Sequence, residues 1–200
     1  MNEQVQTRDL ILKAAVDRIL HYGYSKTTMA EIARDCDMSA GNIYRFFNSK
    51  LDIAEAMARQ KSAMIFQVFA EISRRSHEGA LFRLSEFFTK RLQRTFEVLE
   101  KNDKILEIAE VLGKERPEYV NEQLAQERVY IARILEQGVD SGEIRPLEDP
   151  AFTAEMLQTA LMKFEYPQLW SNLTLAKLEQ EFEGVMDLLR LALENPNTKR

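Results

Sequence analysis

Residues 38–50 read MSAGNIYRFFNSK, and this stretch decides the fold. Ser39 and Ser49 each stand where a helix can begin, because a serine oxygen accepts hydrogen bonds from the free N–H groups of a first turn. Ala40 and Gly41 follow the first serine, and three aromatic residues precede the second. The stretch therefore predicts two helices joined by a very short turn, the first with almost no side-chain bulk at its start.

The residues before this stretch predict another short helix. It begins at Thr27 or Thr28, and Thr28 and Glu31 have the spacing of a capping box. Its apolar positions follow the i, i+3, i+4, i+7 pattern of one helical face: Met29, Ile32, Ala33 and Cys36. Asp37 and Met38 then form the turn, since aspartate tolerates a left-handed backbone better than most residues. The two short helices have the length and spacing of a helix-turn-helix.

Two further helices flank this unit. One runs from Thr7, a predicted N-cap, to about His21, and Gly23 ends it in a left-handed conformation. The other begins at Ser49, which has the capping-box spacing to Asp52. Helices this short, joined by such short turns, must pack at steep angles.

The rest of the chain has helical period throughout, with no alternating pattern typical of a strand. We predict an all-α protein with further helices at about 49–76, 79–100, 102–113, 117–140, 149–164 and 174–194. The helix that begins at Pro117 should end near Gly138 or Gly142.

Composition excludes several classes of protein. One cysteine cannot form an internal disulfide, and two distant histidines leave no zinc-like cluster, so no metal site is predicted. The chain has no long uncharged apolar run and no signal peptide, so we expect a cytoplasmic protein without a membrane contact. Residues 1–60 carry eight basic and eight acidic side chains, so the net charge of −5 lies in residues 61–200. The N-terminal part is thus less repelled by a phosphate backbone.

The second short helix has the chemistry of a DNA-reading helix. In a helix-turn-helix the first residues of this helix face base edges in the major groove. Ser39 starts the helix, and the small residues Ala40 and Gly41 let its backbone approach DNA closely. Asn42 and Arg45 lie away from the apolar side, where they can pair with base edges or touch phosphate.

Three other residues are predicted to position the protein on phosphate. Tyr44 offers a hydroxyl, Lys50 a charge in the first turn of its helix, and Thr28 a hydroxyl beside the free N–H groups of another helix start. Such contacts carry affinity and salt dependence but little sequence information.

The segment from Ile11 to Ala54 resembles the N-terminal domain of the TetR family of transcriptional regulators. The resemblance rests on AA at 14–15, G at 23, TT at 27–28, IA at 32–33, S39, G41, IY at 43–44, F47 and SK at 49–50. The chain departs from the family pattern at Cys36 and Asp37, where Ala-Gly is frequent, and at Leu51, where an acidic residue is frequent.

The resemblance implies an all-α homodimer in two parts. Residues 1–55 would form the helix-turn-helix DNA-binding domain, and residues 56–200 would bind a small inducer and dimerise. Each subunit would read one half of a palindromic operator. The dimer would form through the last two helices, at about 149–164 and 174–194.

The last two helices also carry more apolar surface than a peripheral helix needs, which fits a four-helix dimer interface. The alternative is that they only complete the core of one subunit. Aromatic and methionine side chains are frequent beyond residue 60 and favour a hydrophobic or aromatic ligand, although a core has the same composition. The pocket residues therefore stay unidentified.

We expect a transcriptional regulator, a repressor that a small ligand releases from its operator, and neither an enzyme nor a cofactor protein. The chain has no nucleophile–base pair, HExxH, phosphate loop or cofactor fingerprint. A helical enzyme would have to rely on acids such as Glu107, Glu110 or Glu165. An interaction module that keeps an unused DNA-binding domain is the third possibility. Cys36 lies on the apolar face of its helix and is either a core residue or a redox sensor.

Overall fold

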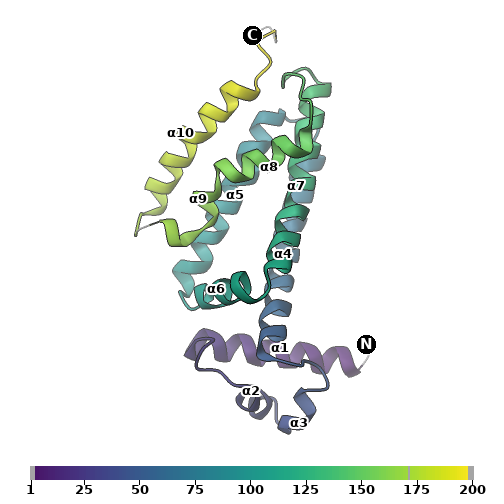
Figure 1. Cartoon of the computed structure of the whole chain (residues 1–200), viewed down its shortest axis with the longest axis vertical. Helices are drawn as coiled ribbons and strands as arrows, with labels where there is room; N and C mark the ends of the chain where they lie inside the picture. Colours follow the sequence, from purple (N-terminus) through teal and green to yellow (C-terminus); the bar gives the residue numbers. More distant parts are fainter. Residues whose placement is uncertain (1–2, 171, 198–200) are drawn as a thin grey trace. The chain divides into compact units, whose positions relative to one another are not determined.

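The computed structural model describes residues 3–170 and 172–197, and this part of the chain is built of helices (Figure 1). The helices are α1 (Glu3–Tyr22), α2 (Met29–Asp35), α3 (Ala40–Ile43), α4 (Lys50–Arg74), α5 (Ala80–Lys101), α6 (Ile105–Glu115), α7 (Pro117–Asp140), α8 (Pro150–Ala160), α9 (Met162–Glu165), the 3-10 helix η1 (Pro167–Leu169) and α10 (Leu175–Leu193). Among the described residues an isolated antiparallel bridge joins Ile144 and Glu194, and no longer strand is present. The predicted all-α class is confirmed.

The chain divides into two compact units. Unit 1 comprises Met1–Met64 and Val98–Glu122, and unit 2 comprises Ile65–Glu97 and Gln123–Arg200. The three N-terminal helices therefore form one unit with α6, which lies far away in the sequence. The two domains expected from the sequence, residues 1–55 and 56–200, stay a prediction.

Unit 1 has an apolar core to which each of its helices contributes. Ile11, Ile19, Ile32, Ile43 and Ile53 are fully buried there. Ile108 and Leu112 of α6 and Tyr119 of α7 complete the same cluster. The 3.6-residue periodicity of α2 predicted which of its residues are buried, whereas the contribution of α6 depends on a contact distant in sequence.

Most predicted helix limits agree with the structure within a few residues. The start of the first helix was wrong, because α1 begins at Glu3 and Thr7 lies inside it. No glycine or proline precedes Thr7, so nothing in the local sequence stops the helix from extending upstream.

The helix expected at 149–164 is interrupted. α8 ends at Ala160, Leu161 caps it with backbone angles φ −97° and ψ 6°, and α9 begins at Met162. Two glycines lie at or near the end of α7, and they have different roles. Gly142 takes the left-handed conformation, with φ 77°. Gly138 lies inside the helix, where an added Cβ would lie 2.7 Å from the Cβ of Ala80.

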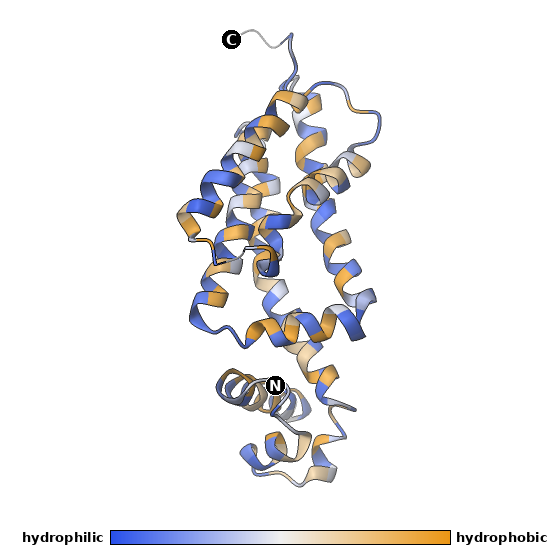
Figure 2. Cartoon of the chain, turned by 60° about the vertical axis from the view of Figure 1, so that its left-hand side comes forward, coloured by the Kyte–Doolittle hydropathy of each residue, from blue (hydrophilic) through white to orange (hydrophobic). Residues whose placement is uncertain are grey.

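Unit 2 is held by aromatic side chains. The rings of Phe69 and Phe87 stack with their centroids 3.8 Å apart, and Phe164 meets Phe182 edge to face at 5.5 Å. Figure 2 shows hydrophilic and hydrophobic residues alternating along the long helices, as amphipathic helices require. Among the aromatic and methionine side chains of unit 2, Met156 and Met162 are exposed, whereas the buried aromatic residues include Phe66, Phe69, Phe87, Phe88, Phe164 and Trp170.

Within the described part of the chain, no helix is long and apolar enough to cross a membrane. Among these same residues no three His, Cys, Asp or Glu side chains gather as metal ligands would.

Candidate nucleic-acid interface

The turn between α2 and α3 has the conformation expected from its sequence. Asp37 is left-handed, with φ 54°, which confirms that aspartate can stand where glycine is favoured. The N–H of Met38 then donates to the carbonyl oxygen of Ala33 at 2.9 Å. The chain thus turns from α2 into α3 over the four residues 36–39.

Side chains cap the starts of α2, α3 and α4, as predicted. Thr28 Oγ1 accepts from the N–H of Glu31 at 3.3 Å, and the Glu31 carboxylate accepts from the N–H of Thr28 at 2.9 Å. Ser39 Oγ accepts from the N–H of Asn42 at 3.2 Å, and Ser49 Oγ accepts from that of Asp52 at 3.1 Å. Thr28 therefore forms a complete capping box.

Thr28 and Ser39 thus have local structural roles, and the DNA contacts predicted for them stay predictions. Both residues are nevertheless exposed at the surface.

The predicted reading segment exposes small and polar residues. Ala40 and Gly41 of α3 are exposed, and so are Tyr44 and Arg45 directly after it, with Tyr44 51% exposed. Asn42 is partly exposed. An added Cβ on Gly41 would meet no heavy atom within 4 Å, so internal packing does not require glycine there.

The opposite side of this segment is anchored in unit 1. Ile43 is fully buried and Phe47 is 5% exposed. Phe46, for which the sequence indicated no role, packs partly buried against the same core. The guanidinium of Arg8 on α1 lies 4.8 Å from the centroid of the Phe47 ring. The exposed and buried residues alternate with the periodicity that the sequence predicted.

Lys50 has internal partners. Its Nζ donates to the carbonyl oxygens of Tyr24 and Thr27 at 2.6 and 2.7 Å, and it lies 4.1 Å from the centroid of the Tyr24 ring. Burial lowers the pKa of this ammonium group below its ordinary value. The lysine therefore fixes the loop between α1 and α2 to the start of α4, and its predicted phosphate contact stays a prediction.

The start of α6 and the residues just before it bond to the same loop and to the end of α1. The carboxylate of Glu107 accepts from the N–H and the Oγ of Ser25 at 3.0 and 2.6 Å. These bonds lower the pKa of Glu107. Asn102 Nδ2 donates to the carbonyl oxygen of Leu20 at 2.8 Å, and Lys104 Nζ donates to that of His21. Sequence reasoning missed this support, since the partners are about 80 residues apart.

The candidate catalytic acids do not form one acidic site. Glu107 is occupied by Ser25 in unit 1, Glu110 is exposed on the same helix, and Glu165 belongs to unit 2. Cys36 is 8% exposed, with its Sγ 3.9 Å from the carbonyl oxygen of Leu10. Burial raises the pKa of this thiol, which lowers the fraction of reactive thiolate.

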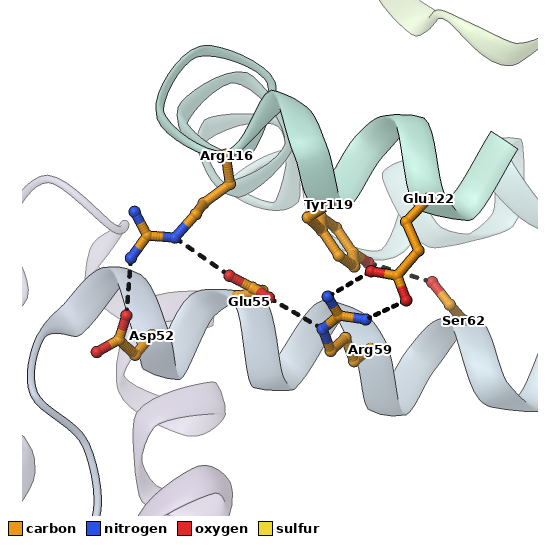
Figure 3. Close-up of polar contacts among 7 residues, drawn as sticks. All are labelled: Asp52, Glu55, Arg59, Ser62, Arg116, Tyr119 and Glu122. Carbon is orange, nitrogen blue, oxygen red and sulfur yellow. Dashed lines mark hydrogen bonds and ion pairs between the residues drawn. The ribbon is translucent and has the colours of Figure 1, made fainter. Parts of the chain in front are cut away.

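Within unit 1, charged side chains join α4 to the end of α6 and the start of α7 (Figure 3). The guanidinium of Arg116 pairs with Asp52 at 2.8 Å and with Glu55 at 3.2 Å. Arg59 pairs with the other oxygen of Glu55 at 2.9 Å and with Glu122 at 2.7 Å. We call these five residues the α4–α7 ladder. It fixes the helix that follows the reading head to a segment of the chain more than 50 residues away.

A second ion-pair group orients α1 against α2. Arg18 Nε lies 2.5 Å from one oxygen of Asp35, and its NH1 lies 3.3 Å from Glu31. The pairing lowers the pKa of Asp35. No sequence motif indicated this contact, because its partners lie 13 and 17 residues apart on different helices.

Comparison with known proteins agrees with this geometry. The bacterial regulatory proteins of the tetR family match residues 11–57, and the tetracyclin repressor-like C-terminal domain matches residues 80–186. The uncharacterized HTH-type transcriptional regulator YhgD of Bacillus subtilis is 28% identical over 159 residues, which cover 75% of this chain and 78% of that protein. The HTH-type transcriptional repressor BepR of Brucella suis is 28% identical over 120 residues, or 60% of this chain and 55% of BepR.

The solved structure of SmeT, the repressor of the Stenotrophomonas maltophilia multidrug efflux pump SmeDEF, has the same fold. Its TM-score is 0.70 at 18% identity, over 96% of this chain and 93% of SmeT. The second matched domain spans more than half of the chain by itself, and the first contains the helix-turn-helix. The chain therefore belongs to the TetR family of bacterial transcriptional regulators.

Proposed function

We propose that this regulator is a repressor that binds a palindromic operator as a homodimer and leaves it when a small ligand binds. Regulators of this family bind DNA operators and small molecules and form dimers. The observation that carries the proposal is the exposed face of α3 and of the turn after it, where Ala40, Gly41, Tyr44 and Arg45 are exposed while Ile43 is buried in the core. BepR and SmeT, both repressors, support the direction of control.

We assign the DNA contacts as follows. Asn42 and Arg45 read base edges, Ala40 and Gly41 admit the backbone, and Tyr44 binds phosphate. Thr28, Ser39 and Lys50 lie at helix starts, where free N–H groups favour an anion. Lys50 uses two of its three N–H donors internally, so its phosphate contact would use the third.

The larger organisation is part of the same proposal. Residues 1–55 form the DNA-binding domain, and residues 56–200 bind the ligand and dimerise, through α8 and α10. Phe152 and Met156 on α8 and Leu188 and Leu191 on α10 are exposed, which supports an interface there. Leu157, Leu161, Leu178 and Phe182 are buried within the subunit, so these helices serve the core as well.

Ligand binding would act on the separation of the two reading heads. A dimer reads two half-sites about 34–36 Å apart, and a ligand that prefers another separation lowers operator affinity. Aromatic side chains fill unit 2, which supports a ligand with hydrophobic or aromatic parts. Since its target is chromosomal DNA, the protein would work in the cytoplasm.

The test begins with the wild-type protein and a random pool of double-stranded DNA. Repeated capture should enrich a palindrome, and its affinity should fall steeply as salt rises, because binding releases counterions from phosphate. Tyr44→Ala and Arg45→Ala should each weaken binding by about tenfold or more while the protein stays folded. Arg133→Ala, an exposed arginine of unit 2, is the control for lost charge and should bind like the wild type.

Failure to enrich any sequence, or equal binding by all four proteins, would contradict the proposal. Repeating the capture with a panel of metabolites should then identify those that release the DNA. Lys50→Ala is a poor probe, since it also removes the donors of two carbonyl groups.

A further inference from the structure

Unit 2 contains a buried group of polar side chains that the DNA-binding function does not use. Arg91 of α5 donates from NH1 to Glu127 Oε1 of α7 at 2.6 Å, and its NH2 lies 3.7 Å from Glu165 Oε2 of α9. Glu127 is 1% exposed, and the side chain of Glu165 is 5% exposed. Gln158 of α8 lies beside them, donating to the carbonyl oxygen of Leu124 at 3.2 Å. Four helices thus converge on one charged group, which we call the Arg91 cluster.

The cluster has more acceptors than donors. Glu127 Oε2 and Glu165 Oε1 are buried without a hydrogen-bond partner, and so is Oε1 of Gln123, one turn before Glu127 on α7. A buried acceptor without a donor is costly, so each of these atoms needs an explanation. Their number indicates a binding partner that supplies several N–H groups.

The charges point in the same direction. Two carboxylates face the single guanidinium of Arg91. A second guanidinium lies at the edge of the cluster, where NH1 of Arg128 donates to Gln158 Oε1 at 3.4 Å. The same atom lies 4.0 Å from a third carboxylate, that of Glu155, so Arg128 does not remove the excess negative charge. An excess negative charge in a buried site must be neutralised, either by a proton or by a cation.

Several aromatic residues lie close along the chain to the residues of the cluster. Phe87 and Phe88 lie one turn before Arg91 on α5, and Phe164 precedes Glu165. The indole N–H of Trp170 donates to the carbonyl oxygen of Lys163 at 2.9 Å, and its ring stacks on Phe96 with centroids 5.9 Å apart. A ligand at the cluster would therefore combine a charged donor group with an apolar body.

We propose that the Arg91 cluster is the recognition site for a cationic ligand, an ammonium group with N–H donors on an apolar body, which bonds to Glu127 Oε2 and Glu165 Oε1. The inference rests on the proposed function, because it specifies the ligand that controls this regulator. Glu127 and Glu165 are the residues that select charge, and Arg91 holds them in place.

Proton exchange follows from the same geometry. Burial raises the pKa of Glu165 to about 7 and also raises that of Glu127. Near neutral pH the empty cluster therefore binds a proton, and an entering cation displaces it. Affinity for a cation should increase by about tenfold between pH 6 and pH 8.

The test uses 4-phenylbutylamine and the free full-length protein in isothermal titration calorimetry. The amine should bind with proton release, seen as a binding heat that depends on the ionisation enthalpy of the buffer. The neutral 4-phenylbutanol should bind at least about tenfold more weakly, and so should the trimethylammonium analogue, which has charge but no N–H. Equal binding of the amine and the alcohol, or no binding of the amine, would overturn the proposal.

Two variants assign the effect to the cluster. Glu127→Gln and Glu165→Gln keep the shape of the side chain and should each reduce amine affinity by about tenfold or more and abolish its pH dependence. Glu136→Gln, on the exposed side of α7, is the matched control and should bind like the wild type. Unchanged amine binding in both cluster variants refutes the assignment.

A separate DNA-binding measurement distinguishes the two proposals. Wild-type protein that binds the amine but no operator would contradict the proposed function and leave the cation site standing. Operator release by the amine in the wild type, lost in Glu127→Gln while that variant still binds DNA, is the result expected when both hold.

Discussion

At the scale of single residues, two glycines of unit 1 have opposite constraints. Gly23 ends α1 with φ 93°, and a Cβ there would lie 2.8 Å from Oε1 of Glu107. That carboxylate is held by Ser25 and cannot move away freely. Gly113 lies within α6, where an added Cβ would meet nothing within 4 Å.

Substituting each glycine by alanine should therefore change stability in opposite directions. Gly23→Ala should lower the free energy of unfolding by about 1–2 kcal/mol, because alanine is strained in the left-handed region. Gly113→Ala should raise it by about 0.5–1 kcal/mol, since glycine costs more backbone entropy in a helix. Chemical denaturation of both variants beside the wild type measures the difference. A stabilised Gly23→Ala variant would show that the loop relaxes without strain.

At the scale of the elements, the α4–α7 ladder and the polar contacts of α6 specify how the helices of unit 1 are arranged, which apolar packing alone would not do. They set the angle and register of the segments that carry the reading head, through bonds of fixed geometry. Individual surface ion pairs contribute little to stability. Their value here lies in defining which residues of α4 and α7 face one another.

The ladder should make unit 1 sensitive to acid. Arg59 lowers the pKa of Glu122 below its ordinary value. A carboxyl group with a lowered folded-state pKa contributes stability above its unfolded pKa of about 4.3, and loses it as pH falls through the folded value. Glu122→Gln should therefore be less stable than the wild type at neutral pH and should lose less stability between pH 5 and pH 3.

Urea denaturation at each pH measures this effect. Glu118→Gln, at an exposed position one turn before Glu122 on α7, should keep the pH dependence of the wild type. About 0.5 M salt should reduce the difference between Glu122→Gln and the wild type through screening. Identical acid profiles for Glu122→Gln and the wild type would mean that the pair contributes nothing in solution.

At the scale of the whole molecule, the proposed dimer would explain why unit 2 has exposed apolar residues. Leu188 and Leu191 are 67% and 74% exposed on α10, more than a subunit core can explain. Two-fold symmetry would place the same patch of two copies against itself. Exposed leucines of this kind are the ones a dimer buries.

Leu188→Glu should convert the proposed dimer to monomers, because it places charges in an apolar contact without a partner. Since this side chain is exposed in the subunit, the helical content should not change. Light scattering after size exclusion gives the mass, and operator affinity should fall along with dimerisation. Val129→Glu, 57% exposed on α7, is the control and should stay dimeric. A Leu188→Glu dimer would exclude α10 from the interface.

Local sequence patterns predicted much of this protein correctly. The caps Thr28, Ser39 and Ser49 act over three residues, and helical periodicity acts over four, so both are legible without a fold. The exposure of Tyr44 and Arg45 opposite Ile43 follows from the same period. Two predictions failed: the first helix does not start at Thr7, and the helix expected at 149–164 is interrupted at Leu161. No glycine or proline marks either position in the sequence.

What the sequence determined by itself is therefore the order of helices, the helix-turn-helix and its exposed face, because each rests on neighbours along the chain. Tertiary structure alone decided the partners of charged side chains. Lys50 forms hydrogen bonds with carbonyl groups 23 and 26 residues away. Glu107 bonds to Ser25 across 82 residues, and Arg91 bonds to Glu127 across 36 residues. A charge has no preferred spacing in sequence, and only folding decides whether water or another residue surrounds it.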